Sequence, residues 1–118
     1  MVIIAVRALF ATALASSSPC LPIIWLFGDS LTEYSGQRGG WSWLLARAYT
    51  GRAAIVNKGL AGQTTRWGVS MTDSLLPPSG EDALLATVWF GANDAVSPRN
   101  VRQHVPLDEY KRNLAGIV

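Results

Sequence analysis

Three short apolar runs recur along the chain, and each is followed by glycine and small polar residues. The runs cover residues 23–27, 53–56 and 84–90. A short, continuous apolar run that ends in a turn signal is typical of a strand buried on both faces of a sheet. The pattern therefore predicts three buried strands.

Apolar residues at helical spacing occupy the intervals between these runs. The spacing predicts helices over residues 41–49 and 64–76 and a third helix that begins near Pro106. The prolines and glycine of residues 77–80 are expected to stop the second helix. Because strands alternate with helices, we expect a parallel sheet covered on both faces, which is a three-layer α/β/α fold.

The loops that follow the predicted strands all contain glycine and small polar side chains. They comprise residues 28–30, 59–64 and 91–94. In parallel sheets, the loops beyond the carboxyl ends of the strands form the ligand crevice. We therefore expect these three loops, which are distant in sequence, to meet at one edge of the sheet.

Each of these loops contains a group suited to acyl transfer. Ser30 directly follows a buried strand, where a tight turn would expose its hydroxyl as a nucleophile. The N–H groups of Ser30 and Gly62 and the amide of Asn93 could together stabilise an oxyanion. Asp29 is expected to bond nearby N–H groups, and Asp94 could cap the next segment. The same residue types also suit ordinary turns and helix caps, which is the simpler interpretation of each alone.

Composition and charge narrow the classes of function. The chain has 118 residues, which is enough for a single domain. Its formal net charge is +2 without a large basic cluster, so no nucleic-acid partner is expected. One cysteine and one histidine provide neither a disulfide framework nor a set of zinc ligands. We expect no metal and no cofactor.

The first 22 residues have a different character from the rest of the chain. They contain no acidic side chain, and an apolar run over residues 8–15 is followed by a Ser-rich stretch. Arg7 and that stretch interrupt the apolar residues, so no membrane-spanning helix is expected. The segment is compatible with a secretory signal, an organellar transit peptide or an extension without structure. We place the domain at residues 23–118. The subcellular location stays open, and it is expected to be cytoplasmic if residues 1–22 are not a targeting signal.

The three loop sequences also resemble the first three sequence blocks of the GDSL or SGNH hydrolase family, in the same order and at similar spacing. The matching stretches are residues 28–33, 59–64 and 91–94. Residues 103–110 look like the isoamyl-acetate-hydrolysing esterase branch of that family. The resemblance covers about residues 23–118.

This resemblance implies a fold, an activity and a set of site residues. The implied fold is a flavodoxin-like parallel sheet with strand order 2-1-3-4-5, of which this chain would supply about three strands of five. The implied activity is hydrolysis of small carboxylic esters such as acetates, without a cofactor. Ser30 would be the nucleophile, its N–H, Gly62 and Asn93 the oxyanion hole, and Asp94 a loop-holding neighbour.

The chain departs from the family pattern at the general base. The family carries a C-terminal Asp-x-x-His, whereas the sole histidine here, His104, has Val101 three positions before it. His104 with Asp94 as its orienting group is a minor alternative. Because a serine hydroxyl is a weak nucleophile without a base, we expect impaired activity. Because the C-terminal motif is missing, we interpret the chain as the N-terminal part of a family member.

An incomplete sheet also has consequences for association and function. The third predicted strand would be an open edge without a lysine or proline to block pairing, so self-association through that edge is expected.

Two other hypotheses for the function remain beside the esterase. One is a carbohydrate deacetylase, an activity the resemblance also implies, and the other is an inert flavodoxin-like module that binds a partner.

Overall fold

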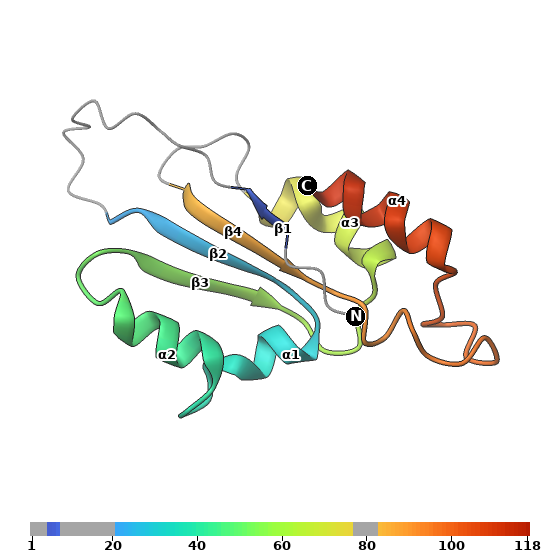
Figure 1. Ribbon diagram of the computed structural model, residues 1–118, viewed down its shortest axis with the longest axis horizontal. Coiled ribbons are helices and arrows are strands. Elements are labelled where there is room, and N and C mark those ends of the chain that lie inside the picture. The colour runs from blue at the N-terminus through green and yellow to red at the C-terminus, as the bar shows by residue number, and fades with distance from the viewer. Residues whose placement is uncertain (1–4, 8–20, 77–82) are drawn as a thin grey trace.

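One mixed sheet forms the centre of the computed structural model, which describes residues 5–7, 21–76 and 83–118 (Figure 1). The strand order is β1-β4-β2-β3. The strands are β1 (Ala5–Arg7), β2 (Ile23–Gly28), β3 (Ala54–Gly59) and β4 (Ala83–Trp89). β2 pairs in parallel with both β3 and β4, whereas β1 pairs antiparallel with β4. The three predicted strands are confirmed, and β3 extends farther than its apolar run.

The predicted helices are also confirmed, with small shifts at their ends. The helices are α1 (Ser30–Glu33), α2 (Trp41–Ala48), α3 (Thr65–Leu75) and α4 (Leu107–Ile117), with a 3-10 turn, η1 (Tyr34–Gly36), after α1. α1 and η1 were not predicted, because elements this short show no period in the sequence. The stretch 77–80, expected to stop α3, lies outside the described residues.

The sheet is covered by α2 on one face. Ile24 and Leu26 of β2 are fully buried there and pack against Trp41, Leu45 and Tyr49. These three residues are spaced four apart, so they form one stripe along α2 and its last turn. Leu44, the residue before Leu45, lies outside this stripe and is 54% exposed.

The opposite face is covered by α3 and α4 (Figure 1). Phe27 points to this side, because successive strand side chains alternate between faces. Its ring lies 5.1 Å from Phe90 and 5.6 Å from Trp67 of α3. Leu114 and Ile117 of α4 complete this cluster. With helices on both faces, the three-layer α/β/α arrangement is confirmed.

The edge of β4 differs from the expectation of an open strand. β1 covers part of it, pairing Ala5 with Val88, Val6 with Thr87 and Arg7 with Ala86. The prediction of a wholly unpaired third strand was wrong, because a three-residue strand has no turn signal or period that reveals it. The domain boundary after residue 22 and self-association through this edge stay predictions.

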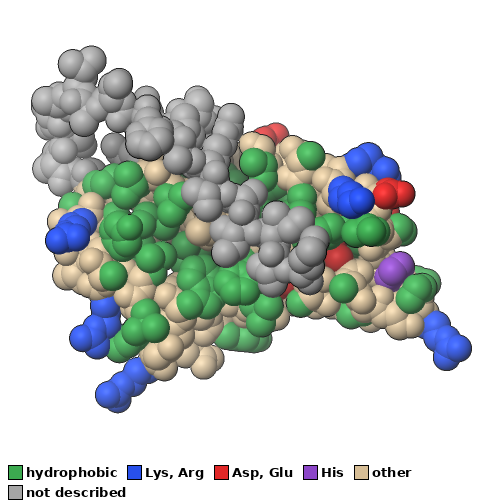
Figure 2. All heavy atoms as spheres, viewed as in Figure 1, with side chains coloured by type: hydrophobic (Ala, Val, Ile, Leu, Met, Phe, Trp, Pro, Cys, Tyr) green, Lys and Arg blue, Asp and Glu red, His purple; other side chains and the backbone are tan. Residues whose placement is uncertain are grey.

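The surface in the same view shows how side chains are distributed. Hydrophobic side chains gather over the sheet, while Lys and Arg side chains lie at the periphery (Figure 2). Within the described ranges, no helix is long and apolar enough to cross a membrane.

Gly59 at the end of β3 is expected to be intolerant of any side chain. A Cβ there would collide with the backbone of Thr32 and Glu33, so Gly59→Ala should lower the free energy of unfolding by about 1 to 3 kcal/mol. Gly116→Ala is the matched control, because its Cβ would lie 3.8 Å from Val69 Cγ2, an ordinary contact. It should be neutral or stabilise by less than about 1 kcal/mol. Urea unfolding followed by circular dichroism measures both, and equal stability of the two variants would contradict this packing.

Candidate active site

Ser30 lies where β2 turns sharply into α1. The Asp29 side chain caps this helix by accepting a hydrogen bond from the Leu31 N–H at 2.9 Å. The Asp29 N–H in turn donates to the carbonyl of Trp89 at 3.3 Å, which ties the turn to the end of β4. Ser30 itself is half-buried, so its side chain reaches solvent. The turn therefore presents a serine at the carboxyl edge of the sheet.

The second loop, which begins at Gly59, is bonded to the first. The Leu60 N–H donates to the carbonyl of Gly28 at 3.0 Å, and the Ala61 N–H donates to Glu33 Oε2 at 2.5 Å. Gly62 follows with a φ of 78°, a left-handed conformation that favours glycine. These bonds place the Gly62 peptide beside the Ser30 turn.

The third loop is bonded to the second. Asn93 Nδ2 donates to the Gln63 carbonyl at 2.7 Å. Asp94 accepts a hydrogen bond at 3.0 Å from the Thr65 N–H, at the start of α3, and another from the Thr65 hydroxyl. The predicted meeting of the three loops at one edge is confirmed, and Asp94 holds its loop to α3.

Three hydrogen-bond donors from these loops are available to a ligand. The N–H of Ser30 belongs to the first residue of a helix, which has no intrahelical acceptor. The Gly62 N–H makes no backbone hydrogen bond within the described part of the chain. Asn93 Nδ2 has a second hydrogen beyond the one given to Gln63. Such a set suits an oxyanion beside a serine hydroxyl.

Two buried carboxylates lie beneath the loops. Asp29 is fully buried and Asp94 is 2% exposed. Burial raises the pKa of Asp29, the N–H groups of Leu31 and Ala92 lower it, and the negative charge of Asp94 raises it again. Asp29 Oδ2 has no hydrogen-bond partner within the described residues. Asp29 and Asp94 therefore act as structural anchors for the loops, and Asp29 is held at an electrostatic cost.

Tyr110 of α4 lies next to these carboxylates. Its hydroxyl donates to the Phe90 carbonyl at 3.0 Å. Burial raises the pKa of Tyr110, and the charges of Asp94 and Asp29 raise it further. The phenol therefore stays protonated and holds the end of β4 to α4.

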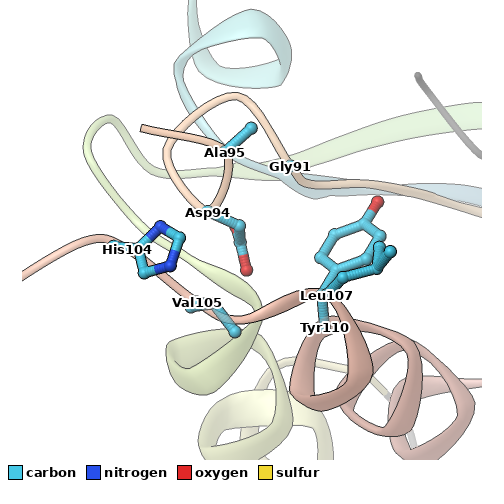
Figure 3. A pocket seen from close by; sticks show the side chains of 7 residues that line it. All are labelled: Gly91, Asp94, Ala95, His104, Val105, Leu107 and Tyr110. Carbon is cyan, nitrogen blue, oxygen red and sulfur yellow. The ribbon is translucent and has the colours of Figure 1, made fainter. Parts of the chain in front are cut away.

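A pocket of about 280 Å³ lies on the α4 side of the third loop (Figure 3). Its lining is mostly apolar, and the Asp94 side chain points into it. The lining residues are Gly91, Asp94, Ala95, His104, Val105, Leu107 and Tyr110. Neither Ser30 nor the oxyanion residues are among them, so this pocket is separate from the proposed nucleophile.

His104 lines this pocket and contacts the backbone of the third loop's continuation. Its Nδ1 lies 2.7 Å from the Val96 carbonyl oxygen. No hydrogen bond joins its ring to Asp94 within the described ranges, and the Asp94 carboxylate is engaged by Thr65. The geometry gives no support to an Asp94–His104 pair.

Sequence reasoning missed the side chains that connect the loops. Glu33 anchors the second loop, Thr65 anchors Asp94, and Gln103 reaches both Gly62 and Asn93. Long-range contacts of this kind leave no local pattern, although Gln103 lies in the stretch that resembles the esterase branch. No group of three or more His, Cys, Asp or Glu side chains could hold a metal ion in residues 5–7, 21–76 and 83–118.

Comparison with known proteins gives a consistent result. The family model described as GDSL-like lipase/acylhydrolase matches residues 26–118. The chain belongs to the GDSL-like lipase/acylhydrolase family. It is 43% identical over 108 residues to an isoamyl acetate-hydrolyzing esterase 1 homolog of Mus musculus, an alignment covering 88% of this chain. It is 45% identical over 101 residues to a GDSL esterase/lipase of Arabidopsis thaliana, covering 80% of this chain.

Solved structures support the same fold. The crystal structure of AlinE4, an SGNH-hydrolase family esterase, matches with a TM-score of 0.64 at 30% identity and covers 86% of this chain and 53% of the other. The alignments span 43% of the mouse relative and 42% of the Arabidopsis relative. The chain therefore spans less than half the length of these relatives.

Asp29→Asn tests the electrostatic cost of the buried carboxylate. The folded-state pKa of Asp29 is raised above its ordinary value of 3.8, so the folded state binds more protons and stability falls as pH rises through that interval. Asn keeps an acceptor for the Leu31 N–H but carries no charge. We expect the variant to lose less stability than the wild type between pH 4 and 7, measured by urea unfolding.

Asp73→Asn, on the exposed surface of α3, is the control for removal of one negative charge. An unchanged slope of stability against pH in Asp29→Asn would contradict the assignment.

Proposed function

We propose that this chain carries the nucleophile and the oxyanion hole of a serine esterase that acts on small carboxylic esters, such as acetates. The observation that carries the proposal is the convergence of three hydrogen-bonded loops around Ser30, Gly62 and Asn93. The mouse relative is named for hydrolysis of isoamyl acetate, which favours a small acyl group here.

The reaction would proceed through an acyl-enzyme. Ser30 Oγ attacks the ester carbonyl, and the carbonyl oxygen becomes negatively charged as the carbon becomes tetrahedral. The N–H groups of Ser30 and Gly62 and the free N–H of Asn93 Nδ2 would stabilise that charge. The Ser30 proton passes to a base and from it to the departing alcohol. Water then attacks the acyl group, which leaves as the carboxylic acid while a proton returns to Ser30 Oγ.

The three loops do not supply the general base that this reaction needs. No hydrogen-bonded base contacts the Ser30 hydroxyl among the described residues, and the sequence contains no Asp-x-x-His. In a catalytic triad, loss of the base leaves only about 10³- to 10⁴-fold catalysis over water from the oxyanion hole and binding. We propose that full activity requires a base from outside the three loops.

Substitution of the nucleophile and one donor tests the proposal. Ser30→Ala should abolish covalent labelling by a fluorophosphonate. Asn93→Ala should reduce the rate of p-nitrophenyl acetate hydrolysis by about 10²- to 10³-fold, because one oxyanion donor is lost. Ser74→Ala, an exposed position on α3, is the control and should leave both signals unchanged.

Substrate choice and failure of labelling separate the alternatives. Preference for isoamyl acetate over an acetylated sugar supports the esterase, and the reverse supports a carbohydrate deacetylase. Absence of labelling at Ser30 in the folded wild-type protein would contradict the proposal and favour an inert binding module.

His104→Gln tests the minor alternative for the base. Glutamine has no basic nitrogen and is close to histidine in length, so the variant removes the candidate base with little change in side-chain size. We expect the rate of p-nitrophenyl acetate hydrolysis to stay within about twofold of wild type. Loss of a general base would lower this rate by about 10²- to 10⁴-fold. A fall of that size, with an unchanged unfolding midpoint, would identify His104 as the base.

A further inference from the structure

One side chain outside the three loops bonds to both of the loops that carry oxyanion donors. Gln103 Nε2 donates to the Gly62 carbonyl at 3.1 Å and to Asn93 Oδ1 at 3.2 Å. Gln103 lies 41 residues from Gly62 in sequence, so this contact exists only in the folded chain. It is half-buried, just before α4.

The hydrogen bonds of Gln103 determine which way the Asn93 amide faces. An amide can be rotated so that its oxygen and nitrogen exchange places, and only its partners decide between the two orientations. Here Asn93 Oδ1 accepts from Gln103 and Nδ2 donates to Gln63, so the two bonds require the same orientation. Among the described residues, one N–H of Asn93 is thereby left without a partner.

Gln103 is itself oriented by a further amide. Asn100 Nδ2 donates to Gln103 Oε1 at 3.0 Å, which leaves Nε2 to face the two loops. The chain of bonds from Asn100 through Gln103 to Asn93 is therefore consistent at every amide. Reversing the Gln103 amide would place an oxygen against two oxygen acceptors, which is unfavourable.

The Gly62 peptide is held in a similar way. The preceding Ala61 N–H is bonded to Glu33, and the following Gly62 carbonyl is bonded to Gln103. The Gly62 N–H lies between these two fixed points. Because glycine rotates more freely than other residues, two such anchors are what restrict the direction of its N–H.

We propose that Gln103 is a positioning residue of the oxyanion hole, which aligns the Asn93 amide and the Gly62 peptide so that their free N–H groups face the same oxygen. The inference rests on the proposed function for its catalytic meaning. The alignment itself can be measured without catalysis.

Gln103→Glu separates positioning from packing. The variant keeps the shape of the side chain and the acceptor for Asn100, but its carboxylate has no donor for Asn93 Oδ1 or the Gly62 carbonyl. When the carboxylate is protonated, near the ordinary Glu pKa of about 4.3, its single O–H can donate again to one of these two oxygens. A role in packing alone would not depend on this protonation.

The test is ¹⁵N NMR of the Asn93 side-chain amide and the Gly62 N–H, recorded at pH 7 and pH 4. At pH 7, Gln103→Glu should shift both signals from wild type, and at pH 4 they should return toward the wild-type positions at the same pH. Gln37→Glu is the matched control at an exposed glutamine and should change neither signal. Asn100→Ala should shift the same two signals in the same direction by a smaller amount.

Kinetics then connects the alignment to the reaction. In Gln103→Glu at pH 7, kcat for p-nitrophenyl acetate should fall by about tenfold or more, less than for removal of a donor, with little change in KM. Unshifted Asn93 and Gly62 signals would overturn the inference. An unchanged kcat in a protein whose activity requires Ser30 would also overturn it and leave the esterase proposal intact. Absence of fluorophosphonate labelling at Ser30 in the folded wild-type protein would instead overturn the proposed function, and the catalytic role of Gln103 with it.

Discussion

The close backbone approach at the carboxyl ends of β2 and β3 is the constraint on which the site depends. Gly28 pairs with Gly59 in the sheet, and neither position has room for a Cβ. A Cβ at Gly59 would meet the backbone of α1, and a Cβ at Gly28 would meet Thr32 and the Trp89 carbonyl. The Ser30 turn therefore packs directly against the ends of β3 and β4 and shares backbone hydrogen bonds with both. A parallel sheet brings its loops to one edge, and this packing brings the first two loops into direct hydrogen-bonded contact there.

The loops are then held by groups that are costly to bury. Asp29 and Asp94 lose almost all contact with water, and Asp29 keeps one oxygen without a partner. Hydrogen bonds to N–H groups offset part of this cost at both carboxylates. Each carboxylate accepts a hydrogen bond from the first turn of a helix that borders the proposed site, α1 for Asp29 and α3 for Asp94. Burial of the two carboxylates therefore costs stability but holds these helix starts in place. Such a trade is common where a fold must hold polar groups in a set arrangement.

Much of the fold, and the edge of the sheet at which the three loops meet, could be predicted from the sequence. The three parallel strands are short apolar runs closed by glycine, so their burial and their common edge follow from local pattern. The sites of Ser30, Gly62 and Asn93 follow because each stands directly beyond such a run. β1 and α1 could not be found this way, since they are too short to show a period.

The connecting network is the other part that local pattern does not reveal. Gln103, like Thr65 and Glu33, acquires its partner only through tertiary packing. A glutamine near a helix start is unremarkable in sequence, and its role depends on two loops that lie elsewhere in the chain. The proposed site therefore combines positions that local pattern predicts with contacts that only the structure reveals.

The most direct test is a crystal structure of the protein with a phosphonate bound covalently to Ser30, since the phosphonyl oxygen takes the place of the oxyanion. We expect one oxygen to lie about 2.7 to 3.1 Å from the Ser30 N–H nitrogen, the Gly62 nitrogen and Asn93 Nδ2. An adduct whose oxygens all point to solvent, with the Gly62 and Asn93 donors directed elsewhere, would contradict the proposed site.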